Sequence, residues 1–262
     1  MDEYFRSYTI RNMGEIGSGG FGYVEKIELF NSFGESRGFC ARKTLSPSSS
    51  EASEEIKRRF KREILLQAKC VHENVVPIYM CNLNAKNPWF IMDLAECDLQ
   101  YEIDNNLLST EDKIKVTEML LKGVSFIHSK GLYHRDIKPK NILRFSHSNR
   151  NINTSYAAKG EYKISDFGLV KNTNTDNDST QLTRIGVGMG TPSYCAPEIV
   201  FFGEYSIQGD IYSIGKVISA LDIDIPGIDE IVQKCTQKIK ENRYSSVDEI
   251  SDALQNITNG GV

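Results

Sequence analysis

The stretch LYHRDIKPKNIL, residues 132–143, places an aspartate, a lysine and an asparagine close together between two apolar ends. Asp, Lys, Pro and Asn are common turn residues, so a charged loop that only faces water is one interpretation. In the alternative interpretation each side chain has a chemical role, since Asp136 accepts a proton, Lys138 neutralises a transferred anionic group and Asn141 holds a metal ion. That alternative requires a phosphate-binding segment and a second metal ligand elsewhere in the chain.

The composition limits the class of protein. The chain has 262 residues, 40% of them hydrophobic, which suffices for one large domain or two small lobes with a real core. Its 31 Lys and Arg residues nearly balance 35 Asp and Glu residues, for a formal net charge of −4. Such a balance creates no overall field for nucleic acid or anionic membranes. We therefore expect neither partner, and any basic site must be local.

The cysteines and the N-terminus indicate the compartment. Six cysteines lie far apart, with no CxxC pair and no matching histidine spacing, which argues against a zinc site and a dense disulfide frame. The N-terminal residues lack a basic patch followed by an apolar core, and no apolar run approaches the roughly 18 residues of a membrane helix. We expect reduced thiols in a cytoplasmic protein without a membrane anchor.

The first part of the chain has a strand pattern. β-branched and aromatic residues recur in segments that Gly, Asn and Pro separate, which predicts five strands at residues 8–17, 21–30, 37–45, 75–83 and 88–94. One helix follows a Ser-rich linker. Three- and four-residue spacing predicts that its apolar face combines Ile56, Phe60, Ile64 and Leu65.

From about residue 94 the pattern becomes helical. A helix is predicted between Ser109, a good N-cap, and Gly131, a good stop, with a stripe made of Ile114, Leu120, Leu121, Val124 and Ile127. Ser246 and Glu249 form the sequence pattern of a capping box. Further helices are predicted over residues 207–221, 228–239 and 246–255, and polar surface loops over residues 146–161 and 171–184.

The segment GSGGFGYV, residues 17–24, spaces Gly17, Gly19 and Gly22 as GxGxxG. The same spacing occurs in dinucleotide-binding folds, but there the glycines lead into a helix. Here YVEKIEL continues as a strand, so we predict a hairpin whose backbone can close over phosphates. Residues without side chains let the backbone amides approach an anion closely.

Three charged residues complete the pattern. Lys43 ends the segment CARK, whose alternation puts it on the same strand face as Ala41. Lys43 and the helical Glu63 would each ordinarily be solvated surface charges, but beside the glycine hairpin they suggest an ion pair that aims Lys43 at phosphates. The segment KISDFGLV offers Asp166 as the second metal ligand, and GTPSYCAPEI follows it.

In this order and spacing, GSGGFG, Lys43 with Glu63, HRDIKPKN, DFG and APE resemble the catalytic domain of eukaryotic-type (Hanks-type) serine/threonine protein kinases, in a compact single-domain form. The resemblance covers about residues 8–257. It implies one kinase domain over residues 1–262 with an α+β, bilobal fold. The N-lobe, to about residue 93, would hold an antiparallel five-stranded sheet and one helix; the C-lobe would be mainly helical, with ATP in the cleft.

The resemblance implies a nucleotide site. Adenine would lie between Val24 and Ala41 on one side and Leu143 on the other, and its polar edge would meet the hinge backbone at Asp93 and Ala95. With Met92 as the bulky residue beside the pocket, the implied set is Ile16, Gly17, Ser18, Gly19, Gly20, Phe21, Gly22, Tyr23, Val24, Ala41, Lys43, Met92, Asp93, Ala95 and Leu143.

The resemblance also implies catalytic roles. Phosphoryl transfer demands mainly positioning and charge neutralisation. Asn141 and Asp166 would coordinate Mg²⁺, with Mn²⁺ as an alternative. Asp136 would orient the substrate hydroxyl and accept its proton, and Lys138 would meet the γ-phosphate. The implied catalytic residues are Asp136, Lys138, Lys43, Glu63, Asn141 and Thr191.

Lys138 also indicates the substrate. Lysine two residues after the catalytic aspartate is typical of serine/threonine kinases, and Thr191 would bond to Asp136 and Lys138. We therefore expect ATP and protein substrates as partners and Ser/Thr specificity, with dual specificity as an alternative. Arg135 would meet a phosphorylated residue of the activation segment, which suggests autophosphorylation, with self-association in trans, at Thr173, Thr175, Ser179, Thr180 or Thr183. In the alternative interpretation, these Ser and Thr residues are ordinary members of a polar loop and are not phosphorylated.

The resemblance also implies two structural interactions, and the sequence departs from the family pattern at three places. Glu198 should pair with Arg243, and Asp210 should brace the catalytic loop. Gln67 stands where the family usually has an apolar residue. The connection at residues 146–161 is longer than usual, and the one at residues 221–227 is shortened.

Two other functions stay open. A pseudokinase scaffold would hold nucleotide without transfer, but Lys43, Asp136, Asn141 and Asp166 are all present. A small-molecule phosphotransferase generally lacks the GTPSYCAPE segment that positions a peptide.

Overall fold

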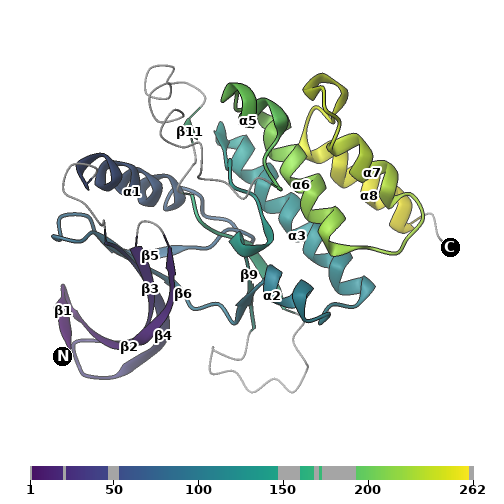
Figure 1. Cartoon of the computed structure of the whole chain (residues 1–262). Helices are drawn as coiled ribbons and strands as arrows, with labels where there is room; N and C mark the ends of the chain where they lie inside the picture. Colours follow the sequence, from purple (N-terminus) through teal and green to yellow (C-terminus); the bar gives the residue numbers. More distant parts are fainter. Residues whose placement is uncertain are drawn as a thin grey trace. The chain divides into compact units, whose positions relative to one another are not determined.

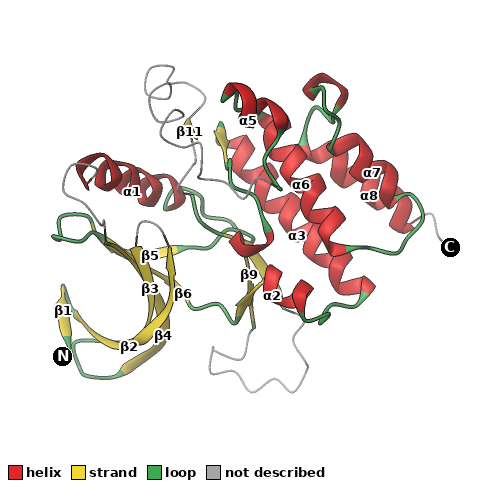
Figure 2. Cartoon of the chain, in the orientation of Figure 1, coloured by secondary structure: helices red, strands yellow, loops and turns green. Residues whose placement is uncertain are grey.

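The computed structural model describes residues 2–19, 22–46, 53–146, 160–167, 171–172 and 193–259. The chain forms two compact units, one of Met1–Val71, Val76–Glu96 and Phe145–Gly160, the other of His72–Val75, Cys97–Arg144 and Glu161–Val262. Strands dominate the first unit and helices the second (Figure 2). The expected α+β class is therefore confirmed.

The first unit contains an antiparallel sheet with the strand order β1-β2-β3-β4-β6-β5 (Figure 1). Its strands are β1 (Glu3–Phe5), β2 (Tyr8–Gly19), β3 (Gly22–Phe30), β4 (Ser36–Leu45), β5 (Ile78–Asn82) and β6 (Trp89–Asp93). All five predicted strands are present, but the sheet has a sixth, β1, which pairs with β2 at one edge.

Packing explains the additional strand β1. The ring of Phe5 meets Trp89 edge to face, with 4.8 Å between the ring centroids. Glu3 also forms an ion pair with Arg42, which is buried and bonds Glu25 on the neighbouring strand. A three-residue strand has no periodicity of its own, so these contacts with distant residues decide its place.

Helix α1 (Ser53–Gln67) belongs to the same unit. Phe60 and Ile64 are buried as predicted, and the ring of Phe60 lies 5.7 Å from that of Phe90. Leu65, however, is 51% exposed, so its assignment to the apolar face was wrong. A helix turns by about 100° per residue, which carries Leu65 past the face of Ile64 and gives the buried positions to Glu63 and Gln67.

The second unit is built from helices. These are α2 (Leu99–Asp104), α3 (Thr110–Ser129), α5 (Pro197–Phe202), α6 (Ile207–Leu221), α7 (Ile228–Cys235) and α8 (Val247–Asn259), with the short 3₁₀ helices η1 (Pro139–Asn141) and η3 (Lys240–Asn242). Helix α6 contacts α3 and α7, and α8 contacts the same two helices (Figure 1). Their buried Leu, Ile and Val side chains form the core of this unit.

The ends of these helices follow from local chemistry. Ser109 and Asp112 form a reciprocal capping box at the start of α3, and Gly131, at a φ of 69°, lies just beyond its end. At α8 the predicted box is half formed: the Oγ atom of Ser246 accepts from the Glu249 amide, but the Glu249 carboxylate bonds Ser245 instead. The predicted helix at residues 228–239 ends early, at Cys235.

Short strands flank the loop that contains Asp136. Strands β8 (Leu132–Tyr133) and β11 (Lys171–Asn172) pair with each other, and β7 (Cys97–Asp98), β9 (Ile142–Phe145) and β10 (Glu161–Ile164) form a small sheet. Most of the predicted loop at residues 146–161 lies outside the described residues. The shortened connection is confirmed, because α6 ends at Leu221 and α7 begins at Ile228.

Two general expectations can be compared with the described residues. None of the six cysteines, all of which the structure describes, forms a disulfide. Within the described ranges, no helix is both long and apolar enough to cross a bilayer.

Candidate active site

The three polar side chains of the opening stretch converge in the loop between β8 and β9. The Lys138 ammonium donates to Oδ2 of Asp136 at 2.8 Å. The side-chain amide nitrogen of Asn141 donates to the same Oδ2 at 3.0 Å and to the Asp136 backbone carbonyl at 2.8 Å. Pro139 starts the 3₁₀ turn that brings Asn141 back to Asp136. The loop is thus closed by its own side chains.

Asp210, in the first turn of α6, holds the backbone of this loop. Its carboxylate accepts hydrogen bonds from the backbone amides of His134 and Arg135, each at 2.8 Å, and lies 2.8 Å from Nε2 of His128. Burial opposes its charge, but the hydrogen bond from His128 leads the opposing contributions and the pKa of Asp210 is lowered. The expected bracing role of Asp210 is therefore confirmed.

His134 links the loop to the segment that carries Asp166. Its Nε2 lies 3.0 Å from the Ser165 carbonyl, and its ring contacts that of Phe167 edge to face. The Ser165 amide donates to the Asn141 carbonyl at 2.8 Å. Asp166 itself has a φ of 65°, a left-handed conformation that is uncommon for residues other than glycine.

The burial of His134 predicts a pH dependence of stability. Burial lowers its pKa, against the nearby carboxylate of Asp210, so the folded protein favours the neutral ring. The contribution of His134 to the free energy of unfolding should therefore be fully present above about pH 6.5, the usual pKa of histidine. Below that pH the free energy of unfolding should fall by up to about 1.4 kcal/mol per pH unit. Urea unfolding at pH 7.5 and pH 5.5 measures this. His134→Gln should show the smaller difference between the two pH values, and equal differences would contradict the prediction.

In the first unit, Lys43 and Glu63 form the predicted ion pair, with 2.9 Å between Nζ and Oε1. Lys43 lies opposite Val24 on β3 and Phe90 on β6, and Ala41 lies opposite Met92. Directly opposite residues of antiparallel strands share a face. The face of the sheet that carries Lys43 therefore also carries three residues of the expected nucleotide site, Val24, Ala41 and Met92.

The glycine segment is a hairpin, as predicted. Strands β2 and β3 pair down to Gly19 opposite Gly22, whereas Gly20 and Phe21 lie outside the described residues. A Cβ atom on Gly22 would lie 2.1 Å from the Thr44 carbonyl oxygen, so the close approach of β4 requires glycine there. At Gly17 the same atom would meet nothing within 4 Å, which leaves open space beside the backbone.

Other predicted site residues are dispersed or not described. Asp93 and Ala95 lie at and just after the end of β6, and Leu143 lies in β9 of the second unit. Ile16, Ser18 and Tyr23 belong to the two hairpin strands. Thr191 and the five candidate phosphorylation sites, Thr173, Thr175, Ser179, Thr180 and Thr183, lie outside the described residues.

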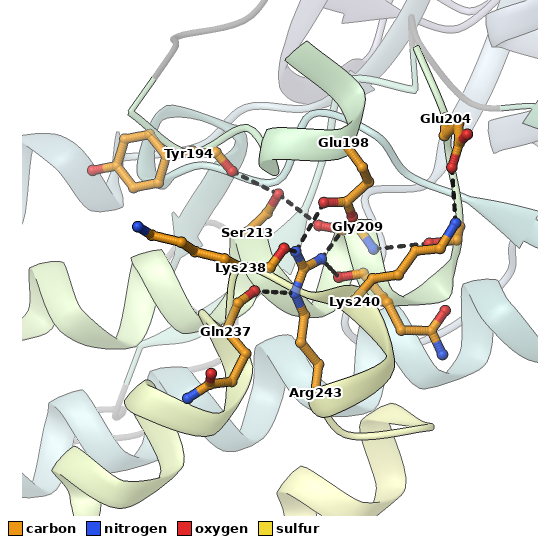
Figure 3. Close-up of polar contacts among 11 residues, drawn as sticks. Tyr194, Glu198, Glu204, Gly209, Ser213, Gln237, Lys238, Lys240 and Arg243 are labelled. Carbon is orange, nitrogen blue, oxygen red and sulfur yellow. Dashed lines mark hydrogen bonds and ion pairs between the residues drawn. The ribbon is translucent and has the colours of Figure 1, made fainter. Parts of the chain in front are cut away.

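Arg243 is the centre of a buried polar cluster beneath α5 (Figure 3). Its guanidinium donates to both carboxylate oxygens of Glu198, at 2.6 and 2.8 Å, so the expected pair is confirmed. It also donates to the backbone carbonyls of Gln237 and Gln208, each at 2.8 Å. Burial opposes the charge on Glu198, but Arg243 outweighs it and the pKa of Glu198 is lowered.

Several contributing residues were not predicted. His128 and Ser165 hold Asp210 and His134, and the Ser213 hydroxyl donates to the Tyr194 carbonyl at 2.8 Å. The only sequence signal for His128 was its place in the last turn of α3, where a basic residue is common. The other two are small polar residues without a distinguishing pattern.

The unusual Gln67 is buried in the first unit. Its amide nitrogen donates to the Val76 carbonyl at 2.9 Å, so the side chain joins the end of α1 to the chain segment before β5. Its Oε1 atom has no hydrogen-bond partner among the described residues. The polar departure is thus partly compensated, at a desolvation cost for one oxygen.

Residues 10–259 match the family model for the protein kinase domain. The chain is 34% identical over 165 residues to the probable serine/threonine-protein kinase fhkE of Dictyostelium discoideum, and 31% identical over 197 residues to the serine/threonine-protein kinase STE20 of Candida glabrata. It is 34% identical over 196 residues to the serine/threonine-protein kinase CST20 of Candida albicans. These alignments cover 61%, 73% and 71% of the chain, but only 21%, 20% and 15% of the three relatives.

Proposed function

Because the chain belongs to the protein kinase family, we propose that it transfers the γ-phosphoryl group of ATP to serine and threonine hydroxyls of proteins. The observation that carries this proposal is the closed loop in which Lys138 and Asn141 both bond Oδ2 of Asp136. The three similar proteins described above are named serine/threonine kinases, which supports this substrate class.

The hydrogen bonds of Asp136 suggest which of its atoms meets the substrate. Oδ2 receives bonds from Lys138 and Asn141, so we assign Oδ1 to the incoming hydroxyl. Asp136 would orient that hydroxyl and accept its proton as the oxygen attacks phosphorus. Lys138 would then exchange part of its bond with Asp136 for the γ-phosphate, where it would offset the charge on the transferred group.

The metal ligands would be Asn141 and Asp166. The amide nitrogen of Asn141 is occupied by Asp136, which leaves its amide oxygen for a cation. An amide oxygen and one carboxylate fit Mg²⁺, which ordinarily takes one or two protein oxygens together with substrate phosphates and water. Mn²⁺ accepts the same ligands. The ion would neutralise phosphate charge during transfer.

The Lys43–Glu63 pair is proposed to position the α- and β-phosphates. Glu63→Gln removes the charge that holds the ammonium, and a charge-assisted bond contributes about 1.5–3 kcal/mol, so kcat/KM for ATP should fall about 10- to 100-fold. Glu54→Gln is the matched control, because Glu54 pairs with Lys57 on the exposed side of the same helix. Steady-state kinetics test this, and equal values for Glu63→Gln and Glu54→Gln would refute the role.

The finer proposals concern regulation and place. Autophosphorylation in the segment that includes Thr173 and Thr183 would create charge-assisted bonds to Arg135, and association of two copies would allow it in trans. We also propose a cytoplasmic location, in line with six cysteines that form no disulfide. Mass spectrometry of ATP-treated protein tests the first proposal, and a fully active protein without segment phosphate would contradict it.

One assay tests the function. Purified protein is incubated with γ-labelled ATP, Mg²⁺ and a generic basic protein, beside Lys43→Met as the inactive control. We expect label on protein only with the unchanged chain. ATP binding without transfer of phosphate would favour the pseudokinase scaffold. Label on a small molecule alone would favour a small-molecule phosphotransferase.

A further inference from the structure

The side chain of Arg135 lies on the ring of Tyr205. The guanidinium carbon is 3.3 Å from the ring centroid, the shortest cation–ring distance in the described part of the chain. Both residues belong to the second unit, and both are half-buried. A cation centred on a tyrosine face at this distance is attracted by the ring electrons, and partial exclusion of water strengthens the attraction.

Arg135 needs external support for its conformation. Its φ is 70°, a left-handed value that is costly for a residue with a long side chain. Arg135 directly precedes Asp136, so a change in its backbone would rotate the peptide that carries the proposed catalytic carboxylate. The Asp210 carboxylate accepts a hydrogen bond from the Arg135 amide at 2.8 Å, which holds one end of the residue.

Tyr205 is placed to hold the other end. It directly precedes Ser206, whose hydroxyl caps the first turn of α6 by accepting from the Gly209 amide. Asp210 lies in that same first turn. Residues at the start of α6 therefore contact Arg135 at two points. Asp210 binds its backbone amide, and the Tyr205 ring packs against its guanidinium.

We propose that Tyr205 is a positioning residue for phosphoryl transfer, which holds Arg135 through its ring and thereby fixes the orientation of Asp136. This inference rests on the proposed function. It predicts that the aromatic face matters and the hydroxyl does not. It also predicts that Tyr205 acts on the chemical step rather than on ATP binding, because its ring contacts Arg135, the residue directly before Asp136.

The test is a double-mutant cycle on the active protein, with kcat and KM measured separately. Tyr205→Leu should lower kcat about tenfold, within the range of a partly desolvated cation–ring contact, and should change KM for ATP less than about twofold. Tyr205→Phe should restore kcat to within about twofold of the unchanged protein. In an Arg135→Met background, Tyr205→Leu should have almost no further effect, since the cation is gone.

Two controls separate this role from general packing. Tyr101→Leu removes a tyrosine from the exposed surface of α2 in the same unit and should leave kcat unchanged. If Tyr205→Leu does not fold, pentafluorophenylalanine at position 205 preserves the ring shape but reverses its charge distribution, and it should lower kcat as the leucine would.

Three results would overturn the inference while leaving kinase activity established. These are an unchanged kcat in Tyr205→Leu, an equal loss in Tyr205→Phe, or an equal loss with and without Arg135. If the unchanged chain transfers no phosphate to protein under any condition, the proposed function itself fails, and this inference fails with it.

Discussion

Asp136→Asn is expected to lower kcat for phosphoryl transfer about 10³-fold, with little change in ATP affinity. A positioned general base contributes about 10²- to 10⁴-fold, and the amide can neither accept the substrate proton nor neutralise Lys138. Lys138 and Asn141 both donate to Oδ2 of Asp136, so the substitution also disturbs the two bonds that close the loop. Rapid-quench transfer assays and ATP titration measure the two quantities separately.

Asp252→Asn supplies the matched control for this substitution. Asp252 is an exposed residue of α8 in the same unit, and its change to asparagine should leave both kcat and ATP affinity unaltered. An Asp136→Asn protein that is folded and retains more than about a tenth of the original kcat would exclude Asp136 as the general base.

Arg243→Leu is expected to reduce the free energy of unfolding by about 3–5 kcal/mol, the usual cost of leaving one member of a buried ion pair without its partner. The substitution strands the Glu198 carboxylate and removes the donor to the Gln237 and Gln208 carbonyls (Figure 3). Chemical denaturation followed by fluorescence or circular dichroism measures the change.

Two further variants make this prediction specific. Arg243→Lys keeps the charge but not the bidentate geometry, and it should cost less than Arg243→Leu. Lys240→Ala breaks the nearby ion pair with Glu204, which is exposed, and should cost less than about 1 kcal/mol. Similar losses for Lys240→Ala and Arg243→Leu would show that burial does not govern the energy of this cluster.

The features with strong local signals could be predicted from the sequence. Helix α6 spans Ile207–Leu221 as expected, because its apolar period lies within one continuous segment. The glycine hairpin was predictable because the residues after it continue a strand. The Lys43–Glu63 pair was suggested by its place after the glycine hairpin. The Glu198–Arg243 pair was predictable only through the family resemblance, since periodicity does not connect positions 45 residues apart.

The features that were missed depend on contacts across the chain. The bond between His128 and Asp210 joins residues 82 positions apart, and nothing near His128 indicates its partner. Strand β1 is held by Trp89 and Arg42 on other strands. Leu65 was predicted to be a core residue because leucine is apolar, but in the folded protein the buried positions of this part of the helix are occupied by Glu63 and Gln67.

The most direct measurement of the central claim is phosphoamino acid analysis of a protein substrate labelled from γ-labelled ATP by the unchanged chain and by Asp136→Asn. The proposed function predicts phosphoserine and phosphothreonine with the unchanged chain and almost no label with the variant. Label confined to phosphotyrosine, or equal labelling by both proteins, would contradict it.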